Sequence, residues 1–340
     1  MRAIAVTTIA SQESIGIKRL FELAELTKSQ LVIIGDVKTP RWNLKAVPKF
    51  VHYFSIEEQA KKWPTLSDLL PLNHYARKNL AYLWALENDV SILLDTDDDN
   101  YADSDVFEKA DQNYRKYKGK SEWVNTYAHF GRPEIWPRGL PLDEAFKPLG
   151  STEQTSEDPN WQCFQSIVDG DPDLDAIGRM LNPQNHIFED FEALVLGTEN
   201  FCPTNSQATL WRRPLLPFLY LPITSSFRMT DIWRGIIISG YQKANGFSTI
   251  FGKLGFKQER NEHNLLSDFV DEIPGHLHNR VIKQIADNLW NSNVNSREDN
   301  LTFLSIYKEL VSLEILRESE MQSIQEYIKV VENLNVYEKI

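Results

Sequence analysis

The chain has 340 residues, of which 42% are hydrophobic and 25% charged, a composition typical of a globular protein with one large domain or two. Its formal net charge of −12 argues against nucleic acid or an anionic membrane as the main partner, because both would repel it. The two cysteines, Cys163 and Cys202, lie far apart and have no neighbouring ligand spacing, so neither a disulfide framework nor a zinc site is indicated.

The N-terminus does not resemble a signal peptide, because Met1 and Arg2 lead straight into a short apolar run that ends at Thr7 and Thr8. No apolar run approaches the roughly 20 residues of a membrane span. We therefore expect a cytoplasmic protein without an integral membrane segment.

The first hundred residues alternate short apolar runs with helical patterns, which is typical of βαβ units and a largely parallel sheet. This pattern predicts helices over 14–27 and 73–87, and strands over 3–6, 31–34, 50–54 and 91–94. In such sheets, ligands bind at the carboxyl ends of the strands. Thr7, Thr8 and Asp36 follow the first two strands, so we expect them to line a binding site.

The run Asp95-Thr96-Asp97-Asp98-Asp99-Asn100 follows the fourth predicted strand. Four carboxylates held this closely repel one another unless a positive group lies among them. In an extended segment Asp95, Asp97 and Asp99 share one side and offer hard oxygen ligands to Mg²⁺ or Mn²⁺. Such a cation would bind a diphosphate. A solvated acidic turn is the alternative.

Two cations, Arg77 and Lys78, fall in the first turn of the predicted helix over 73–87. This placement opposes the helix dipole, which favours anions at the N-terminus. A phosphate at this helix end would be bound by both side chains and by free backbone N–H groups. The alternative is that either cation is solvated or pairs with a nearby acid.

Between residues 118 and 240 the regular alternation is lost, and segments such as 130–139 and 169–175 are rich in Trp, Pro, Arg and Asp. They contain too many turn residues for long elements and too many aromatic residues for disorder. We expect ordered loops that line a site, the alternative being that their tryptophans fill a core. Asp231 opens a predicted helix over 231–239, where the dipole stabilises a carboxylate, so it is either a base or a helix cap.

From His276 onward the composition favours helices, with amphipathic patterns over 281–290, 301–316 and 319–334. These helices are expected to cover the domain or to form a contact between copies in a homo-oligomer.

Four blocks in series, 94–100, 125–139, 169–176 and 227–235, together resemble the STELLO family of glycosyltransferases. The Asp-Pro-Asp-x-Asp-Ala element at 171–176 and the Asp-Ile-Trp-x-Gly element at 231–235 are also similar to those of the reversibly glycosylated polypeptides, the UDP-arabinose mutases. In addition, Arg77-Lys78-Asn79 before a strand that ends in Asp-x-Asp resembles the donor half of GT-A glycosyltransferases.

The resemblance implies an α/β GT-A nucleotide-diphospho-sugar transferase fold over residues 1–270, with a mostly parallel, Rossmann-like sheet. Residues 1–117 would form its nucleotide-binding half and 118–270 its acceptor half, followed by a helical C-terminal extension over 271–340. The implied reaction moves a sugar from a nucleotide-sugar donor, UDP-linked by expectation, to a glycan or lipid-linked glycan acceptor. The implied cofactor is Mn²⁺ or Mg²⁺.

The resemblance also implies roles for single residues. The metal ligands would be Asp97 and Asp99, with Asp98 in the same cluster and His263 as a later ligand. Asp95 would support the metal or bond the donor. Asp231 would be the base of an inverting displacement, with retention at the anomeric carbon as the alternative. The remaining contacts would come from Thr7, Thr8 and Asp36 at the nucleoside, Arg77, Lys78 and Asn79 at the phosphates, and Arg228 and Arg234 at the acceptor or a phosphate.

Two other functions stay open on this sequence. A sugar-nucleotide mutase or a nucleotidyltransferase would use a similar sheet and donor. A non-catalytic scaffold that binds a sugar or a protein partner would keep the fold without the chemistry.

Overall fold

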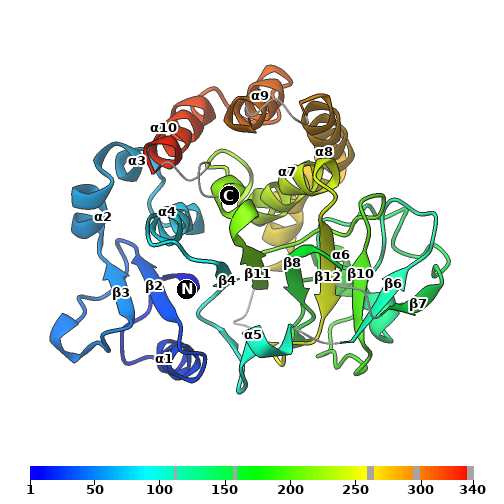
Figure 1. The fold of residues 1–340 in the computed structure, drawn as a ribbon, viewed down its shortest axis with the longest axis horizontal. Helices are drawn as coiled ribbons and strands as arrows, with labels where there is room; N and C mark the ends of the chain where they lie inside the picture. The colour runs from blue at the N-terminus through cyan, green and yellow to red at the C-terminus, as the bar shows by residue number, and fades with distance from the viewer. Residues whose placement is uncertain (111–112, 156–158, 259–263, 294–298, 335–340) are drawn as a thin grey trace.

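The structure is a computed structural model that describes residues 1–340 except 111–112, 156–158, 259–263, 294–298 and 335–340. A ten-stranded mixed sheet forms its centre, with helices on both faces (Figure 1). In spatial order the strands are β3 (Val51–Phe54), β2 (Gln30–Gly35), β1 (Arg2–Thr8), β4 (Ile92–Thr96), β11 (Ala208–Arg212), β8 (Trp161–Ser166), β12 (Ser248–Gly252), β10 (Ala193–Leu196), β6 (Tyr114–Tyr117) and β7 (Thr152–Thr155).

A second, three-stranded sheet joins segments that are distant in the chain. Its order is β5 (Asn100–Tyr101), β13 (Lys257–Gln258) and β9 (Asp169–Gly170). The helices are α1 (Ile15–Leu26), α2 (Ile56–Lys62), α3 (Pro64–Leu69), α4 (Asn79–Glu87), α5 (Val106–Lys109), α6 (Ala176–Leu181), α7 (Thr230–Ala244), α8 (Leu265–Ser292), α9 (Asp299–Ser312) and α10 (Glu320–Asn333).

Strand β1 lies at the point where the strand order changes direction. It pairs in parallel with β2 on one side and with β4 on the other, so Thr8 lies opposite Gly35 and Ala5 opposite Asp95. Such a switch point opens a crevice beyond the carboxyl ends of the strands. The α/β class is confirmed, and the arrangement agrees with the expected GT-A fold.

The two faces of β1 enter different cores because successive side chains of a strand point to opposite sides. Ile4 and Val6 pack with residues of α1 and α5, whereas Ala3 and Ala5 pack with residues of α4 and α7. The helices on both faces therefore hold the ends of β1, β2 and β4 in place.

The structure differs from the sequence prediction in two segments that bear on the site. The helix expected over 73–87 begins only at Asn79, and Tyr75–Lys78 form the 3₁₀ helix η2 instead. The loops expected over 118–240 include β8 and β11, which lie near the middle of the large sheet. Both strands are almost wholly buried, so the alternation of apolar and polar residues that reveals a half-exposed strand is missing.

The three C-terminal helices share one core with the sheet. Ile282 and Trp290 of α8 and Phe303 of α9 belong to the cluster that also contains Ala3 and Val32. The boundary expected after residue 270 falls inside α8. Figure 1 shows α10 beside α3, so the last described helix packs against an element of the first hundred residues. Within the described ranges, no helix combines the length and the apolar character that crossing a bilayer requires.

Candidate functional site

A cavity of about 390 Å³ opens at the carboxyl ends of β1, β2 and β4. Nine of the residues expected from the sequence line it: Thr7, Thr8, Asp36, Arg77, Asp97, Asp98, Asp99, Arg228 and Asp231. Four others, Lys78, Asn79, Asp95 and Arg234, are fully buried and do not line it. His263 lies outside the described residues.

Asp95 is the centre of a buried ion-pair network. Its carboxylate accepts hydrogen bonds from Lys78 Nζ at 3.0 Å and Arg234 Nη1 at 2.6 Å. Tyr82 Oη at 2.9 Å and Ser206 Oγ at 3.1 Å donate to the same group. Burial acts to raise the pKa of Asp95, but the two cations outweigh it and hold the pKa below its ordinary value. A metal or donor contact by Asp95 would have to displace these four donors.

The cations expected at the phosphates have protein partners in the structure. Lys78 Nζ donates to Asp95, to the Thr96 carbonyl at 2.9 Å and to Asp97 at 2.9 Å, which uses all three of its donors. Arg77 donates to Gln59 Oε1 from two nitrogens, at 2.6 and 2.8 Å.

Arg77 also donates to the Leu70 carbonyl at 2.9 Å, and Asn79 exchanges two hydrogen bonds with the Leu221 backbone. A phosphate contact by Arg77, Lys78 or Asn79 would therefore cost buried hydrogen bonds.

The rest of the acidic run faces the cavity. The Asp97 side chain is 42% exposed, and Lys78 Nζ donates to its Oδ1 at 2.9 Å. Partial burial and the nearby Asp99 raise the pKa of Asp97 to about 7. Asp98 accepts a hydrogen bond from the Thr8 hydroxyl, and Asp99 accepts one from Gln258 Nε2 at 2.8 Å. The small sheet thus fixes Asp99, because Gln258 is part of β13.

These carboxylates suit a metal site that a ligand's phosphate oxygens complete, rather than a site formed by protein side chains alone. Among the described residues, no three His, Cys, Asp or Glu side chains are grouped closely enough to hold an ion by themselves. Mg²⁺ in proteins is commonly held by one or two carboxylates together with water and substrate phosphates. Asp97 and Asp99 supply such carboxylates at the edge of a cavity.

The charges around the cavity have a consequence for anionic ligands. Its lining contains six aspartates and four lysine or arginine residues: Asp36, Asp97, Asp98, Asp99, Asp173, Asp231, Lys38, Arg77, Arg138 and Arg228. Three of the cations, all arginines, are bound to protein acceptors. Within the described part of the chain, Lys38 forms neither an ion pair nor a hydrogen bond through its ammonium group. A diphosphate would need more positive charge than these side chains offer.

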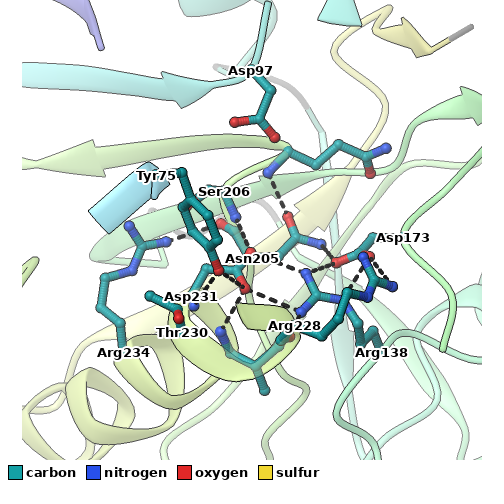
Figure 2. A network of polar contacts seen from close by, with 12 residues as sticks. Tyr75, Asp97, Arg138, Asp173, Asn205, Ser206, Arg228, Thr230, Asp231 and Arg234 are labelled. Atoms are coloured by element: carbon teal, nitrogen blue, oxygen red, sulfur yellow. Dashed lines mark hydrogen bonds and ion pairs between the residues drawn. The ribbon is translucent and has the colours of Figure 1, made fainter. Parts of the chain in front are cut away.

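The wall opposite the acidic run is built around Arg138, whose side chain lies between two aspartates (Figure 2). It donates to both oxygens of Asp173 at 2.8 Å and to both oxygens of Asp231 at 3.1 Å. Asp173 also accepts from Asn205 Nδ2 at 2.8 Å, and Asp231 from the Ser206 backbone N–H at 3.0 Å. Arg138 and Asp173 belong to the segments 130–139 and 169–175, which were expected to line a site. The sequence did not single out either residue.

Tyr75 controls one oxygen of Asp231. Its hydroxyl lies 2.9 Å from the Phe227 carbonyl. It also lies 3.2 Å from Asp231 Oδ1 (Figure 2). A hydroxyl has one proton, so it donates to only one of these acceptors at a time. Burial raises the pKa of Tyr75 well above its ordinary value, which keeps the proton in place. When Tyr75 donates to Phe227, Asp231 Oδ1 still accepts from the Ile232 backbone N–H at 3.0 Å and from Arg138 Nη1 at 3.1 Å, so a ligand hydroxyl would share this oxygen with them.

The two arginines near Asp231 have different surroundings. Arg228 Nε donates to Glu272 of α8 at 3.0 Å, and the side chain reaches the cavity. Arg234 donates to Asp95 and to the Asn205 carbonyl at 3.1 Å, and it is fully buried. Of the two, Arg228 is placed to meet a ligand.

Comparison with known proteins gives two relatives from Arabidopsis thaliana. The chain is 29% identical over 238 residues to "Probable glycosyltransferase STELLO2", covering 63% of this chain and 30% of that protein. It is 27% identical over 255 residues to "Probable glycosyltransferase STELLO1", covering 68% of this chain and 32% of that protein. The chain thus spans less than a third of the length of either relative. No family model matches the chain.

Among solved structures, one described as "Crystal Structure of a Mycobacterial Protein" aligns with a TM-score of 0.42 at 11% identity, covering 82% of this chain and 74% of that one.

Proposed function

We propose that this chain, a homologue of the STELLO family of glycosyltransferases, moves a sugar from a UDP-linked donor to a hydroxyl of a glycan or lipid-linked glycan. One observation carries the proposal: the cavity at the switch point of the sheet gathers six carboxylates, and its arginines are already bound to protein acceptors. A nucleotide diphosphate entering this cavity requires a cation between it and the protein.

Asp97 and Asp99 are the residues we propose to hold Mn²⁺ or Mg²⁺, with the neighbouring Asp98 as a further candidate. His263, which lies outside the described residues, stays a candidate from the sequence. When bound, the cation would supply the positive charge that stabilises a departing diphosphate. Thr7, Asp36 and Lys38, at the ends of β1 and β2, are placed for the nucleoside and its phosphates. Thr8 contributes by holding Asp98.

On the opposite wall, Asp231 is the proposed base. Arg138 and the Ile232 backbone N–H hold Oδ1 of this carboxylate in one orientation, and Tyr75 can turn its proton from Oδ1 to the Phe227 carbonyl. Oδ1 would then take the proton of the acceptor hydroxyl while that oxygen bonds to the anomeric carbon and the bond from that carbon to the diphosphate breaks. This direct displacement inverts the anomeric centre.

The proposal is tested by incubating the purified protein with a panel of UDP-sugars and glycan acceptors, with Mn²⁺ or with EDTA, and measuring UDP release and product. We expect release that needs both Mn²⁺ and an acceptor, at least 100-fold slower in Asp231→Asn. The Tyr75→Phe variant should keep part of the activity, since it leaves Asp231 and Arg138 in place.

Two outcomes would count against this function. Turnover that continues unchanged in EDTA would show that the reaction does not require a metal. An isomerised UDP-sugar formed without acceptor would identify a mutase instead.

A further inference from the structure

The outer face of α8 carries a stripe of exposed aliphatic side chains, which we call the α8 stripe. It consists of Leu266, Val270, Ile273, Leu277 and Val281, which are 38% to 69% exposed. Their spacings of three and four residues place them on one side of the helix, over roughly 22 Å. The opposite side of α8 is buried against α7. A continuous apolar stripe of this length marks an interaction surface more often than scattered exposed residues do.

The exposed positions of α8 lack acidic residues, although the chain has 48 Asp and Glu in all. The other exposed residues of this helix are Ser267, Arg280, Gln284, Asn288, Asn291 and Ser292. Two copies of a protein with a net charge of −12 repel one another overall. The acids that contact an exposed side chain of this helix, Asp143 and Glu144, are bound to Arg280 at 2.8 and 2.9 Å. Because their charge is balanced locally and the stripe itself carries none, repulsion is weak at this face, which suits a second copy of the same chain.

Two pairs of residues in the α8 stripe are placed symmetrically about one point of the helix. The pairs Leu266 with Val281 and Val270 with Leu277 share one midpoint, which lies between Ile273 and Pro274. A two-fold axis through this midpoint would set the two helices antiparallel. Each Leu266 would then face Val281 of the other copy, each Val270 would face Leu277, and the two Ile273 side chains would meet near the axis. Closed two-fold interfaces require such self-complementarity.

We propose that α8 forms a homodimer interface in which two copies pair antiparallel about the Ile273–Pro274 midpoint. Met180 and Leu181 at the end of α6, which packs against α8, are also exposed and would add apolar area at the rim. The stripe alone is short of the roughly 1,200 Å² that a stable interface buries, so the dimer dissociates on dilution.

The register is tested by sedimentation velocity of the full chain over a range of concentrations. We expect a monomer–dimer equilibrium in the wild type, and dimer affinity at least 10-fold weaker in Val270→Glu and in Leu277→Lys. The double variant Val270→Glu/Leu277→Lys should recover the dimer, because each introduced glutamate would face an introduced lysine of the other copy. Leu301→Glu, an exposed leucine of α9, is the matched control and should leave the dimer unchanged.

A second test uses a new cysteine, because Cys163 and Cys202 are both buried. Ile273→Cys should form a disulfide-linked dimer on mild oxidation, whereas Leu301→Cys should not. A wild type that stays monomeric at all concentrations, or folded single and double charge variants that are equally monomeric, would overturn the proposal.

Discussion

Asp95 and Asp97 are two residues apart in one acidic run, but their surroundings give them opposite tasks. Asp95 is fully buried and neutralises Lys78 and Arg234, whereas the half-exposed Asp97 faces the cavity. Alternation along a strand predicts that both point the same way, and the sequence does not show which cations lie beneath them. The pairing of Asp95 with Arg234 joins positions 139 residues apart, a distance over which no local pattern carries information.

This difference predicts the effect of removing each charge. Asp95→Asn should lower the free energy of unfolding by about 3–5 kcal/mol, because it removes the counter-charge of the buried Arg234 and leaves Lys78 with Asp97 alone. Asp97→Asn should change it by less than about 1 kcal/mol, since the side chain is half-exposed. Urea denaturation followed by circular dichroism measures both, and equal losses in the two variants would contradict this assignment.

A second prediction concerns His129, which is buried beside Tyr117 and outside the cavity. Burial, together with the nearby Arg115, lowers the pKa of His129 to about 4. In the unfolded chain the pKa of this histidine is near 6.5. Between pH 6.5 and 4 the unfolded chain therefore binds a proton that the folded protein does not, and the free energy of unfolding falls as the pH falls through this range. The loss is on the order of 3 kcal/mol when complete.

His129→Asn, which cannot titrate, should show a flatter dependence of Tm on pH between 6.5 and 4 than the wild type. Parallel curves for the two proteins would show that His129 does not cause the loss.

At the scale of elements, the first turn of α1 supports the acidic run. A Cβ atom on Gly16 would lie 1.9 Å from the carbonyl oxygen of Asp98, so only glycine allows this approach. Gly16→Ala should therefore displace the loop of Asp97 to Asp99 and weaken Mn²⁺-dependent UDP binding at least 10-fold. Gly197→Ala is the matched control, because a Cβ there would meet nothing within 4 Å. Calorimetric titration that gave the same affinity for both variants would contradict the contact.

The elements that the sequence predicted well are those with regular patterns. The strands expected over 3–6, 31–34 and 91–94 correspond to β1, β2 and β4, with ends that differ by a few residues. The three expected C-terminal helices correspond to α8, α9 and α10, of which α8 begins well before its expected start at 281. The central strand β8 was missed because Gln162 and Gln165 are buried in it, and a polar residue inside a fully buried strand resembles a loop. The Gln165 side chain is hydrogen-bonded there to Asn205 and Thr209, partners that no local sequence pattern predicts.

At the scale of the whole molecule, the C-terminal helices are part of one structure with the sheet. Glu320 at the start of α10 is fully buried and accepts hydrogen bonds from Tyr220 Oη at 2.6 Å and from the Thr224 backbone N–H at 2.8 Å. The pattern of the sequence shows amphipathic helices but not the surface that they cover. The cavity depends on this packing, because Glu272 of α8 holds Arg228 in its wall.

The central claim is that a divalent cation joins the carboxylates of Asp97 and Asp99 to a nucleotide diphosphate. Its most direct test is isothermal titration calorimetry of UDP into the wild type and into Asp97→Asn/Asp99→Asn, each with Mn²⁺ and with EDTA. We expect binding only in the wild type with Mn²⁺, while both proteins keep the same far-ultraviolet circular dichroism spectrum. UDP binding of equal strength in EDTA, or in the double variant, would contradict the claim.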